Sequence, residues 1–190
     1  TSVGHSKKII YRNKAKLHDD IYVTGNLGDS YIGLKILQNK IRIDKKLKNY
    51  FVKKYFEPEI QIDLTKELFK FANSSIDISD GLIDDLEKMI NKQKLSYKIW
   101  EEQIPISKNL YSYLKKNELK KSNFISNGDD YQILFTASAD KSRIIKNISK
   151  KLGLKISRIG QINSNNKKSV FIDKKGEYLL VKNSGYKHQF

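Results

Sequence analysis

The stretch Ile76-Asp77-Ile78-Ser79-Asp80-Gly81-Leu82 lies where a strand pattern gives way to a helical one. The residues of 74–78 predict a short buried strand. Beyond it, apolar residues recur at the spacing of one helix face, at Leu82, Ile83, Leu86, Met89 and Ile90. We therefore expect Asp80 at or next to the N-cap of a helix, with Asp77 in the strand before it.

The chemistry of Asp77, Ser79 and Asp80 is compatible with two interpretations. Carboxylates at such a junction can hold hard cations such as Mg²⁺, which take oxygen ligands. The free N–H groups of a helix N-terminus attract phosphate, so the stretch would suit a metal–phosphate site. Asp and Ser are also common helix caps, and a purely structural role explains them equally well. The stretch alone leaves both interpretations open.

Two further segments combine glycine with acidic residues. Thr24-Gly25-Asn26-Leu27-Gly28-Asp29-Ser30 predicts a strand, a glycine turn and a helix capped by Asp29 or Ser30. It lacks the glycine-rich dinucleotide fingerprint and a P-loop lysine, so it either faces a phosphate or packs beside another loop. Asn127-Gly128-Asp129-Asp130-Tyr131 precedes another predicted strand. Its two acids either close a turn or bind a polar or cationic ligand.

Two isolated residues are weaker candidates. Tyr186, next to Gly185, could stack on a ligand ring, although residues at a chain end usually fray. Arg12 is one of few arginines, and a surface charge explains it equally well.

The remaining patterns predict an α/β fold in which helices are layered on a mixed sheet. Strands are expected at the tail of 1–11 and at 21–24, 95–100, 132–136, 156–162, 169–172 and 178–181. Helices are expected after 29–30, over 50–56, after a cap at Asp63, over 107–116 and over 139–151. Helices and strands do not alternate strictly, which argues against a simple doubly wound sheet.

Composition excludes several classes of protein. The chain has 190 residues, 38% of them hydrophobic, and no apolar run approaches 18 residues, so we expect no membrane span. The absence of cysteine excludes disulfides and thiolate metal sites, which is typical of the cytoplasm. The histidines show no metal-site spacing. Because Met89 is the single methionine, we expect the chain to be a piece of a longer protein.

The net charge of +16 does not by itself indicate nucleic-acid recognition. Lysines are spread along the chain, and the arginines that favour base and bidentate phosphate contacts are scarce. We expect no specific nucleic-acid binding, although weak salt-sensitive binding to polyanions remains open.

Taken together and in order, these segments resemble thiamine-monophosphate kinase, a family of the aminoimidazole-ribonucleotide-synthetase-like superfamily. The matching pieces span nearly the whole chain: Arg12, Ile21 to Gly25, Gly28-Asp29-Ser30, Gly33-Leu34, Ala72-Asn73-Ser74, Ile76 to Leu82, Asp85-Leu86, Gly128 to Tyr131, Phe135-Thr136, Ile159-Gly160 and Gly185-Tyr186. The order and spacing make the combination specific, although each piece alone is not.

The resemblance implies ATP- and Mg²⁺-dependent phosphorylation of thiamine phosphate to thiamine diphosphate. It places Mg²⁺ on Asp77 and Asp80, and ATP on Arg12 and Ser79. Thiamine phosphate would contact Asp129, where the family has glutamate, and the C-terminal aromatic residue Tyr186. No side chain resembles a catalytic nucleophile or general base, and a phosphate acceptor needs none.

The resemblance also implies that residues 1–18 are the tail of a missing N-terminal domain and a connector. Residues 19–190 would form a domain like the C-terminal domain of aminoimidazole ribonucleotide synthetase. The expected partners are thiamine phosphate, the missing domain and, in the full-length protein, a second copy in a homodimer. We expect the fragment to be inactive alone. Alternatives are another enzyme of the superfamily, such as a selenophosphate synthetase or a hydrogenase maturation protein, and a non-catalytic remnant that serves as a binding module.

Overall fold

The computed structural model describes residues 8–91, 93–164, 166, 168–173 and 175–179. Its centre is a six-stranded sheet in the order β2-β4-β1-β5-β3-β6. The strands are β1 (Asp20–Thr24), β2 (Ser74–Asp77), β3 (Leu95–Trp100), β4 (Ile133–Ala137), β5 (Ile156–Ser164) and β6 (Val170–Ile172). Neighbouring strands are antiparallel, except for the parallel pair β3 and β6. The predicted mixed sheet is thus confirmed.

Alternate residues of the central strands face opposite layers, as the pleat requires. On β1, Ile21 and Val23 point to one apolar cluster, and Tyr22 points to a second. On β4, Leu134 belongs to the first cluster and Phe135 to the second. Both faces of the sheet centre are therefore covered, which explains why these strands are almost continuously apolar.

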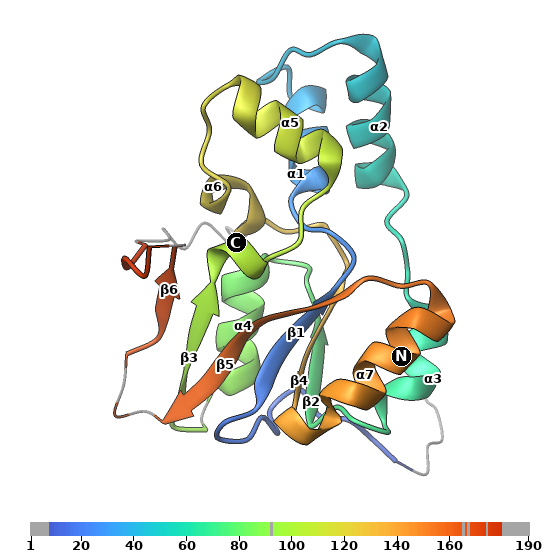
Figure 1. The fold of residues 1–190 in the computed structure, drawn as a ribbon. Helices are drawn as coiled ribbons and strands as arrows, with labels where there is room; N and C mark the ends of the chain where they lie inside the picture. The colour runs from blue at the N-terminus through green and yellow to red at the C-terminus, as the bar shows by residue number, and fades with distance from the viewer. Residues whose placement is uncertain (1–7, 92, 165, 167, 174, 180–190) are drawn as a thin grey trace, which may run out of the picture.

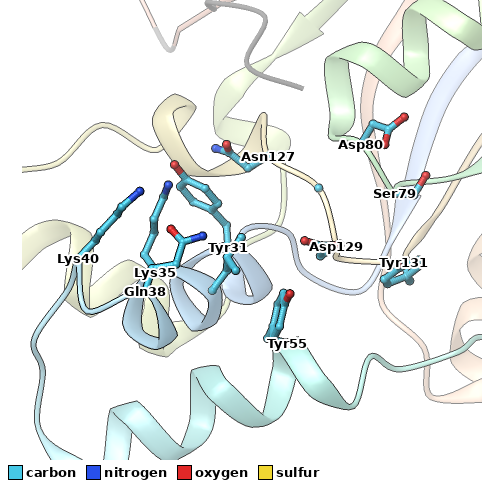
Figure 2. A pocket seen from close by; sticks show the side chains of 12 residues that line it. Tyr31, Lys35, Gln38, Lys40, Tyr55, Ser79, Asp80, Asn127, Asp129 and Tyr131 are labelled. Atoms are coloured by element: carbon cyan, nitrogen blue, oxygen red, sulfur yellow. The ribbon is translucent and has the colours of Figure 1, made fainter. Parts of the chain in front are cut away.

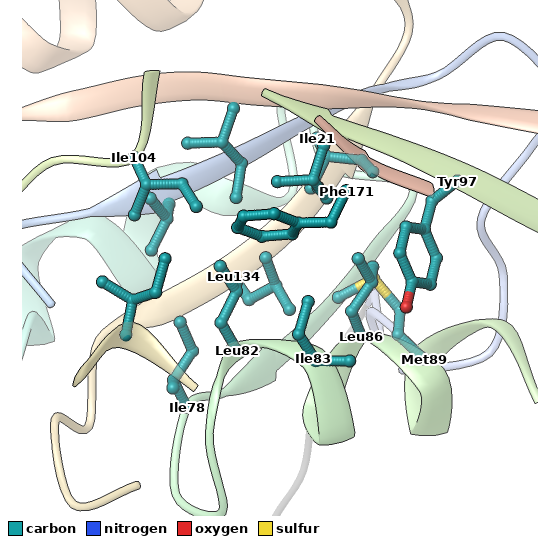
Figure 3. Packing of buried hydrophobic residues seen from close by; sticks show 14 of the residues in the cluster. Ile21, Ile78, Leu82, Ile83, Leu86, Met89, Tyr97, Ile104, Leu134 and Phe171 are labelled. Atoms are coloured by element: carbon teal, nitrogen blue, oxygen red, sulfur yellow. The ribbon is translucent and has the colours of Figure 1, made fainter. Parts of the chain in front are cut away.

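Three helices cover the two faces (Figure 1). Helix α4 (Leu82–Ile90) lies on the first face, where its apolar stripe packs against the sheet (Figure 3). Helices α3 (Ile62–Leu68) and α7 (Ser142–Leu152) lie on the second face, and their buried residues surround the stacked rings of Tyr22 and Phe135. The predicted layering of helices on a sheet is confirmed.

A separate group of helices stands beyond one end of the sheet (Figure 1). It comprises α1 (Asp29–Leu37), α2 (Lys45–Phe56), α5 (Lys108–Lys116) and α6 (Ser122–Ile125), which share a third apolar cluster centred on Phe51. Two short 3₁₀ helices, η1 (Glu101–Gln103) and η2 (Ala139–Lys141), complete the described elements. This helical group forms the far wall of the candidate site.

Several predicted element ends need correction. Helix α1 begins after Gly28, not after a capping Asp29 or Ser30, because the Asp29 carboxylate turns into the interior. The N-cap of α3 is Gln61, and Asp63 lies in its first turn. The short helix α6 was not predicted, and residues 8–11 do not form a strand.

Two predictions about the chain ends have partial outcomes. Within the predicted last strand, Tyr178 makes one isolated antiparallel bridge with Ile172, and 180–181 lie outside the described residues. The domain boundary after residue 18 stays a prediction. In the described part of the chain, no helix is both long enough and apolar enough to cross a membrane.

Candidate functional site

A cavity of about 720 Å³ opens between the sheet end and the helical group. Figure 2 shows Tyr31 and Lys35 of α1 and its C-cap Gln38 on one side of it, and Ser79 and Asp80 on the other. The remaining lining residues are Leu34, Lys40, Tyr55, Asn127, Gly128, Asp129 and Tyr131. Four segments that are separate in the sequence therefore meet around one polar cavity.

The loop 79–81 is held by an aspartate of the helix that it precedes. The buried carboxylate of Asp85 accepts hydrogen bonds from the backbone N–H groups of Ser79 (2.9 Å), Asp80 (2.9 Å) and Gly81 (3.2 Å). Gly81 is the N-cap and has a φ of 123°, so its own position offers no side-chain cap. Asp80 lies next to the N-cap, as predicted, and Asp85 satisfies the exposed amides in its place.

One lysine joins this loop to the helix. The ammonium group of Lys88 donates to Asp85 (2.7 Å) and also contacts the carboxylate of Asp80. Burial alone would lower the pKa of Lys88, but its hydrogen bonds to Asp80 and Asp85 raise it above the ordinary lysine value. Lys88 is therefore a firmly charged counterion of both acids.

The loop 126–129 lies directly against the loop 79–81. The N–H of Asp129 donates to the carbonyl of Ser79 at 3.0 Å, and that of Tyr131 to the carbonyl of Ile78 at 2.9 Å. A Cβ atom on Gly128 would lie 1.9 Å from the carbonyl oxygen of Ser79, so only glycine fits there. This contact fixes Asp129 and Asp80 on the same cavity.

The carboxylate of Asp129 lies within the electrostatic influence of Asp80. Partial burial, and then the nearby charge of Asp80, raise the pKa of Asp129 above the ordinary aspartate value. Like charges this close attract a cation or a cationic ligand, since either would relieve their repulsion. Of the two interpretations of the segment 127–131, this geometry favours ligand binding for Asp129.

The neighbouring acid, Asp130, has the opposite environment. Its carboxylate is buried and accepts a hydrogen bond from the N–H of Gly28 at 2.8 Å. Burial raises the pKa of Asp130 to about 8. The segment 24–30 thus packs beside the loop 127–131, the second alternative left open by the sequence.

Asp29 is also structural in this arrangement. Its buried carboxylate accepts from the hydroxyls of Ser107 (2.7 Å) and Tyr50 (2.8 Å). Burial raises its pKa, and these two hydrogen bonds oppose the rise. Asp29 therefore ties α1 to α2 and α5, and it does not line the cavity that Ser79, Asp80 and Asp129 share.

The predicted site residues have different positions. Ser79, Asp80 and Asp129 line the cavity. Asp77 is exposed at the end of β2, just outside the lining. Tyr186 lies outside the described residues. The structure thus brings together three of the six predicted residues and places a fourth beside them.

Arg12 lies away from this cavity. Ile10 packs against the apolar cluster beneath α3 and α7, whereas Ala15 belongs to the cluster beneath α4. The segment between them therefore passes around the sheet end at which β1 begins, and the cavity lies at the end at which β1 stops. Arg12 itself is exposed.

Sequence reasoning missed the aromatic and basic residues contributed by the helical group. Tyr31 and Lys35 lie at i and i+4 on one face of α1, and the C-cap Gln38 continues this spacing at i+7. The ammonium of Lys35 lies 4.6 Å from the ring centroid of Tyr31. That spacing was readable in the sequence, but Tyr55 and Tyr131 reach the cavity only through tertiary packing.

The donor chemistry of the cavity fits a hard divalent cation incompletely. Asp77, Asp80 and Asp129 offer the carboxylate oxygens that Mg²⁺ prefers. However, no group of three or more acidic or histidine side chains among the described residues is close enough to hold a metal ion by itself. Further ligands must come from water, from phosphate or from another part of the protein.

Comparison with known proteins identifies relatives of this chain. No model of a protein family matches it. The thiamine-monophosphate kinase of Buchnera aphidicola subsp. Schizaphis graminum is 37% identical over 183 residues, which are 96% of this chain and 56% of that protein. The thiamine-monophosphate kinase of Escherichia coli strain K12 is 32% identical over 182 residues, which are 95% and 55% of the two chains.

Solved structures agree with these relatives. The thiamine-monophosphate kinase of Stenotrophomonas maltophilia K279a superposes with a TM-score of 0.76 at 27% identity, covering 90% of this chain and 54% of that one. The complex of AaThiL with AMPPCP and TMP gives a TM-score of 0.76 at 28% identity, covering 95% and 54%. The described fold, the cavity between its glycine-bearing loops and these likenesses make the chain a homologue of the thiamine-monophosphate kinases, spanning about half the length of its curated relatives.

Proposed function

We propose that this chain is the C-terminal part of a kinase that transfers the γ-phosphoryl group of ATP to thiamine phosphate, forming thiamine diphosphate and ADP. The observation that carries the proposal is the contact between the loops 79–81 and 126–129. This contact places Asp80 and Asp129 on one cavity, so that a metal–phosphate group and an acceptor can meet there.

The cavity suits thiamine phosphate in size and chemistry. Its volume of about 720 Å³ is ample for a small molecule. The thiazolium ring of thiamine is a cation, which the carboxylate of Asp129 and the faces of Tyr31, Tyr55 and Tyr131 would attract. Asp129 is one methylene shorter than the glutamate of the family, so we expect the substrate to sit closer to the loop. Tyr186 is proposed as an additional ring contact.

Asp77 and Asp80 are the proposed ligands of Mg²⁺, with Ser79 hydrogen-bonding an ATP phosphate. When bound, Mg²⁺ would neutralise the charge that develops on the transferred phosphoryl group. The chain's own contribution is positional, because donor and acceptor are both anionic and must be brought into line against their repulsion. No protein nucleophile is required.

The proposed ATP contact of Arg12 requires a composite site. Because Arg12 lies at the other end of the sheet from the cavity, it cannot reach a nucleotide held at Ser79 in the same copy. We therefore propose that Arg12 contacts ATP bound with the missing N-terminal half or with a second copy in a homodimer. The isolated chain would then not turn over.

The test is thiamine diphosphate formation from thiamine phosphate, ATP and Mg²⁺, with this chain alone and with the N-terminal half of the Buchnera relative supplied separately or fused. We expect product only when both halves are present. Product from the isolated chain would contradict the composite site. No product from a folded fusion would contradict the thiamine phosphate assignment and favour another acceptor or a non-catalytic remnant.

Site variants of the active fusion sharpen this test. Asp80→Asn should lower kcat by about a hundredfold, the scale on which removal of one preorganised electrostatic group is felt. Asp129→Asn should chiefly raise the KM for thiamine phosphate. The exposed Asp140→Asn in η2 is the matched control and should change neither constant.

A further inference from the structure

The side chain of Lys88 contacts two acids of different character. Asp85 lies three residues before it on the same helix, and its side chain is completely buried. Asp80 lies eight residues before it, and 30% of its side chain is exposed beside the cavity. In the helical ion pairs Lys66–Asp63 and Lys53–Glu57, by contrast, the lysine contacts one acid within a single helical turn.

The contact with Asp85 has the character of a permanent bond. A buried carboxylate needs compensation for its lost hydration. Asp85 obtains it from three backbone N–H groups on one oxygen and from Lys88 on the other. Releasing Lys88 from Asp85 would leave a buried charge less well compensated, so ligand binding in the cavity is not expected to break this pair.

The contact with Asp80 has the character of an exchangeable bond. Helical spacing does not require it, because Asp80 lies before the helix. The Asp80 carboxylate is partly solvated, so water or a cation can replace the ammonium group at little desolvation penalty. The same carboxylate is the proposed ligand of Mg²⁺, and two cations on one carboxylate repel each other.

We propose that Lys88 is a tethered cation that holds Asp80 while no divalent cation is bound, and that it must release Asp80 when one binds. Lys88 stays on Asp85 throughout and swings away from Asp80 alone. It thereby keeps the loop 79–81 ordered before binding, and it weakens the affinity of the site for the metal. The inference rests on the proposed function, which makes Asp80 a metal ligand.

The test is Mn²⁺ binding to the complete chain, followed by electron paramagnetic resonance, with Mg²⁺ as competitor. Lys88→Met keeps the length of the side chain and removes its charge. We expect it to tighten Mn²⁺ binding about threefold to tenfold, as loss of one nearby like charge at a partly exposed site would do. Lys88→Arg keeps the charge and should show no gain. Lys150→Met, at an exposed lysine of α7, is the matched control.

Lys88→Gln guards against a folding defect, because its amide can still donate to Asp85 while carrying no charge; it should tighten binding in the same direction. When Lys88→Met is combined with Asp80→Asn, the tightening of Mn²⁺ binding should disappear.

Equal or weaker Mn²⁺ binding by folded Lys88→Met and Lys88→Gln would overturn the inference and leave the metal assignment standing. If Asp80→Asn binds Mn²⁺ as well as the unaltered chain, the metal assignment to Asp80 fails and the inference falls with it. Kinase activity of the fusion is a separate readout, so the two failures are distinguishable.

Discussion

Two strand-to-helix junctions in this molecule are built alike and used differently. The junctions β1–α1 and β2–α4 both place a glycine with positive φ at the helix N-cap, Gly28 at 88° and Gly81 at 123°. At the first, the N–H of Gly28 donates to Asp130, more than a hundred residues away. At the second, Asp85 of the same helix accepts all three free amides.

Whether the cap is remote or local determines whether the acids near each junction are buried or face the cavity. The remote capping acid, Asp130, connects two segments, and both it and Asp29 are held in buried hydrogen bonds. A local capping acid satisfies the amides of the junction from within the same helix, so that no remote side chain is needed as a cap and Asp80 can face the cavity. A strand–glycine–helix motif with acids can therefore form either a ligand site or a purely structural junction. In this molecule, the ligand-facing junction is capped from its own helix, and the structural junction is capped by a remote residue.

The largest effect on stability should follow from a substitution at Gly128 that pushes the loops 79–81 and 126–129 apart. Its Cβ would meet the backbone oxygen of Ser79 at 1.9 Å, and no rotamer change can relieve a backbone contact. We expect Gly128→Ala to lower the free energy of unfolding by about 3 kcal/mol or more, measured by urea denaturation.

Gly153→Ala is the control for this variant. Gly153 has a φ of 60° with no atom near its Cβ position, so the change tests backbone strain without a clash. It should lower the free energy of unfolding by about 1 kcal/mol. Equal effects of the two substitutions would show that the loops are not in contact as described.

The next largest effect should follow from removing the local cap. Asp85→Asn keeps the shape of the side chain but removes the charge that three amides and Lys88 share. We expect a loss of about 2 to 3 kcal/mol in the free energy of unfolding, since hydrogen bonds to a buried charge are strong. Asp84→Asn, on the same helix, is a neighbouring comparison and should have the smaller effect. A loss below that of Asp84→Asn would contradict the capping role.

The sequence alone predicted the elements whose apolar residues follow a regular period. The helical stripe from Leu82 to Ile90 and the alternation on β1 and β4 follow directly from burial on one or both faces. The segments 76–82 and 127–131 were recognisable as site candidates, because each places carboxylates and a glycine at an element end, although caps and turns use the same residues.

The rest depended on contacts that the sequence does not encode locally. Asp129 and Asp130 are identical in type and adjacent, yet one faces the cavity and the other is buried, because Tyr131 pairs with Ile78 and fixes which side chain turns inward. Tyr55 reaches the cavity only because α2 folds back over α1. The resemblance places ATP on both Arg12 and Ser79, but Arg12 lies at the other end of the sheet from Ser79.

The remote cap should make stability depend on pH. Because the folded chain raises the pKa of Asp130 to about 8, it keeps a proton that the unfolded chain releases above the ordinary aspartate value. The contribution of Asp130 to stability is therefore complete at low pH and is lost as the pH rises from about 4 towards 8, by up to about 1.4 kcal/mol per pH unit.

Asp130→Asn tests this dependence, because asparagine does not titrate and still offers an oxygen to Gly28. Urea denaturation at several pH values should show the unaltered chain losing stability relative to Asp130→Asn as the pH rises through this range. Parallel stability profiles would contradict the buried, protonated state of Asp130.

The smallest effect is expected at Asp77, and its smallness is informative. Asp77 ends β2 in an exposed position, where the backbone pairs with Ile133 and the side chain is not needed for the sheet. Asp77→Asn should change the free energy of unfolding by no more than about 0.5 kcal/mol, as surface substitutions usually do. Urea denaturation beside Asp85→Asn measures the contrast. If Asp77→Asn were as destabilising as Asp85→Asn, both acids would be structural, and the β2–α4 junction would be a joint like β1–α1. A neutral result, together with a lowered kcat of the same variant in the fusion, would separate ligand binding from folding at this junction.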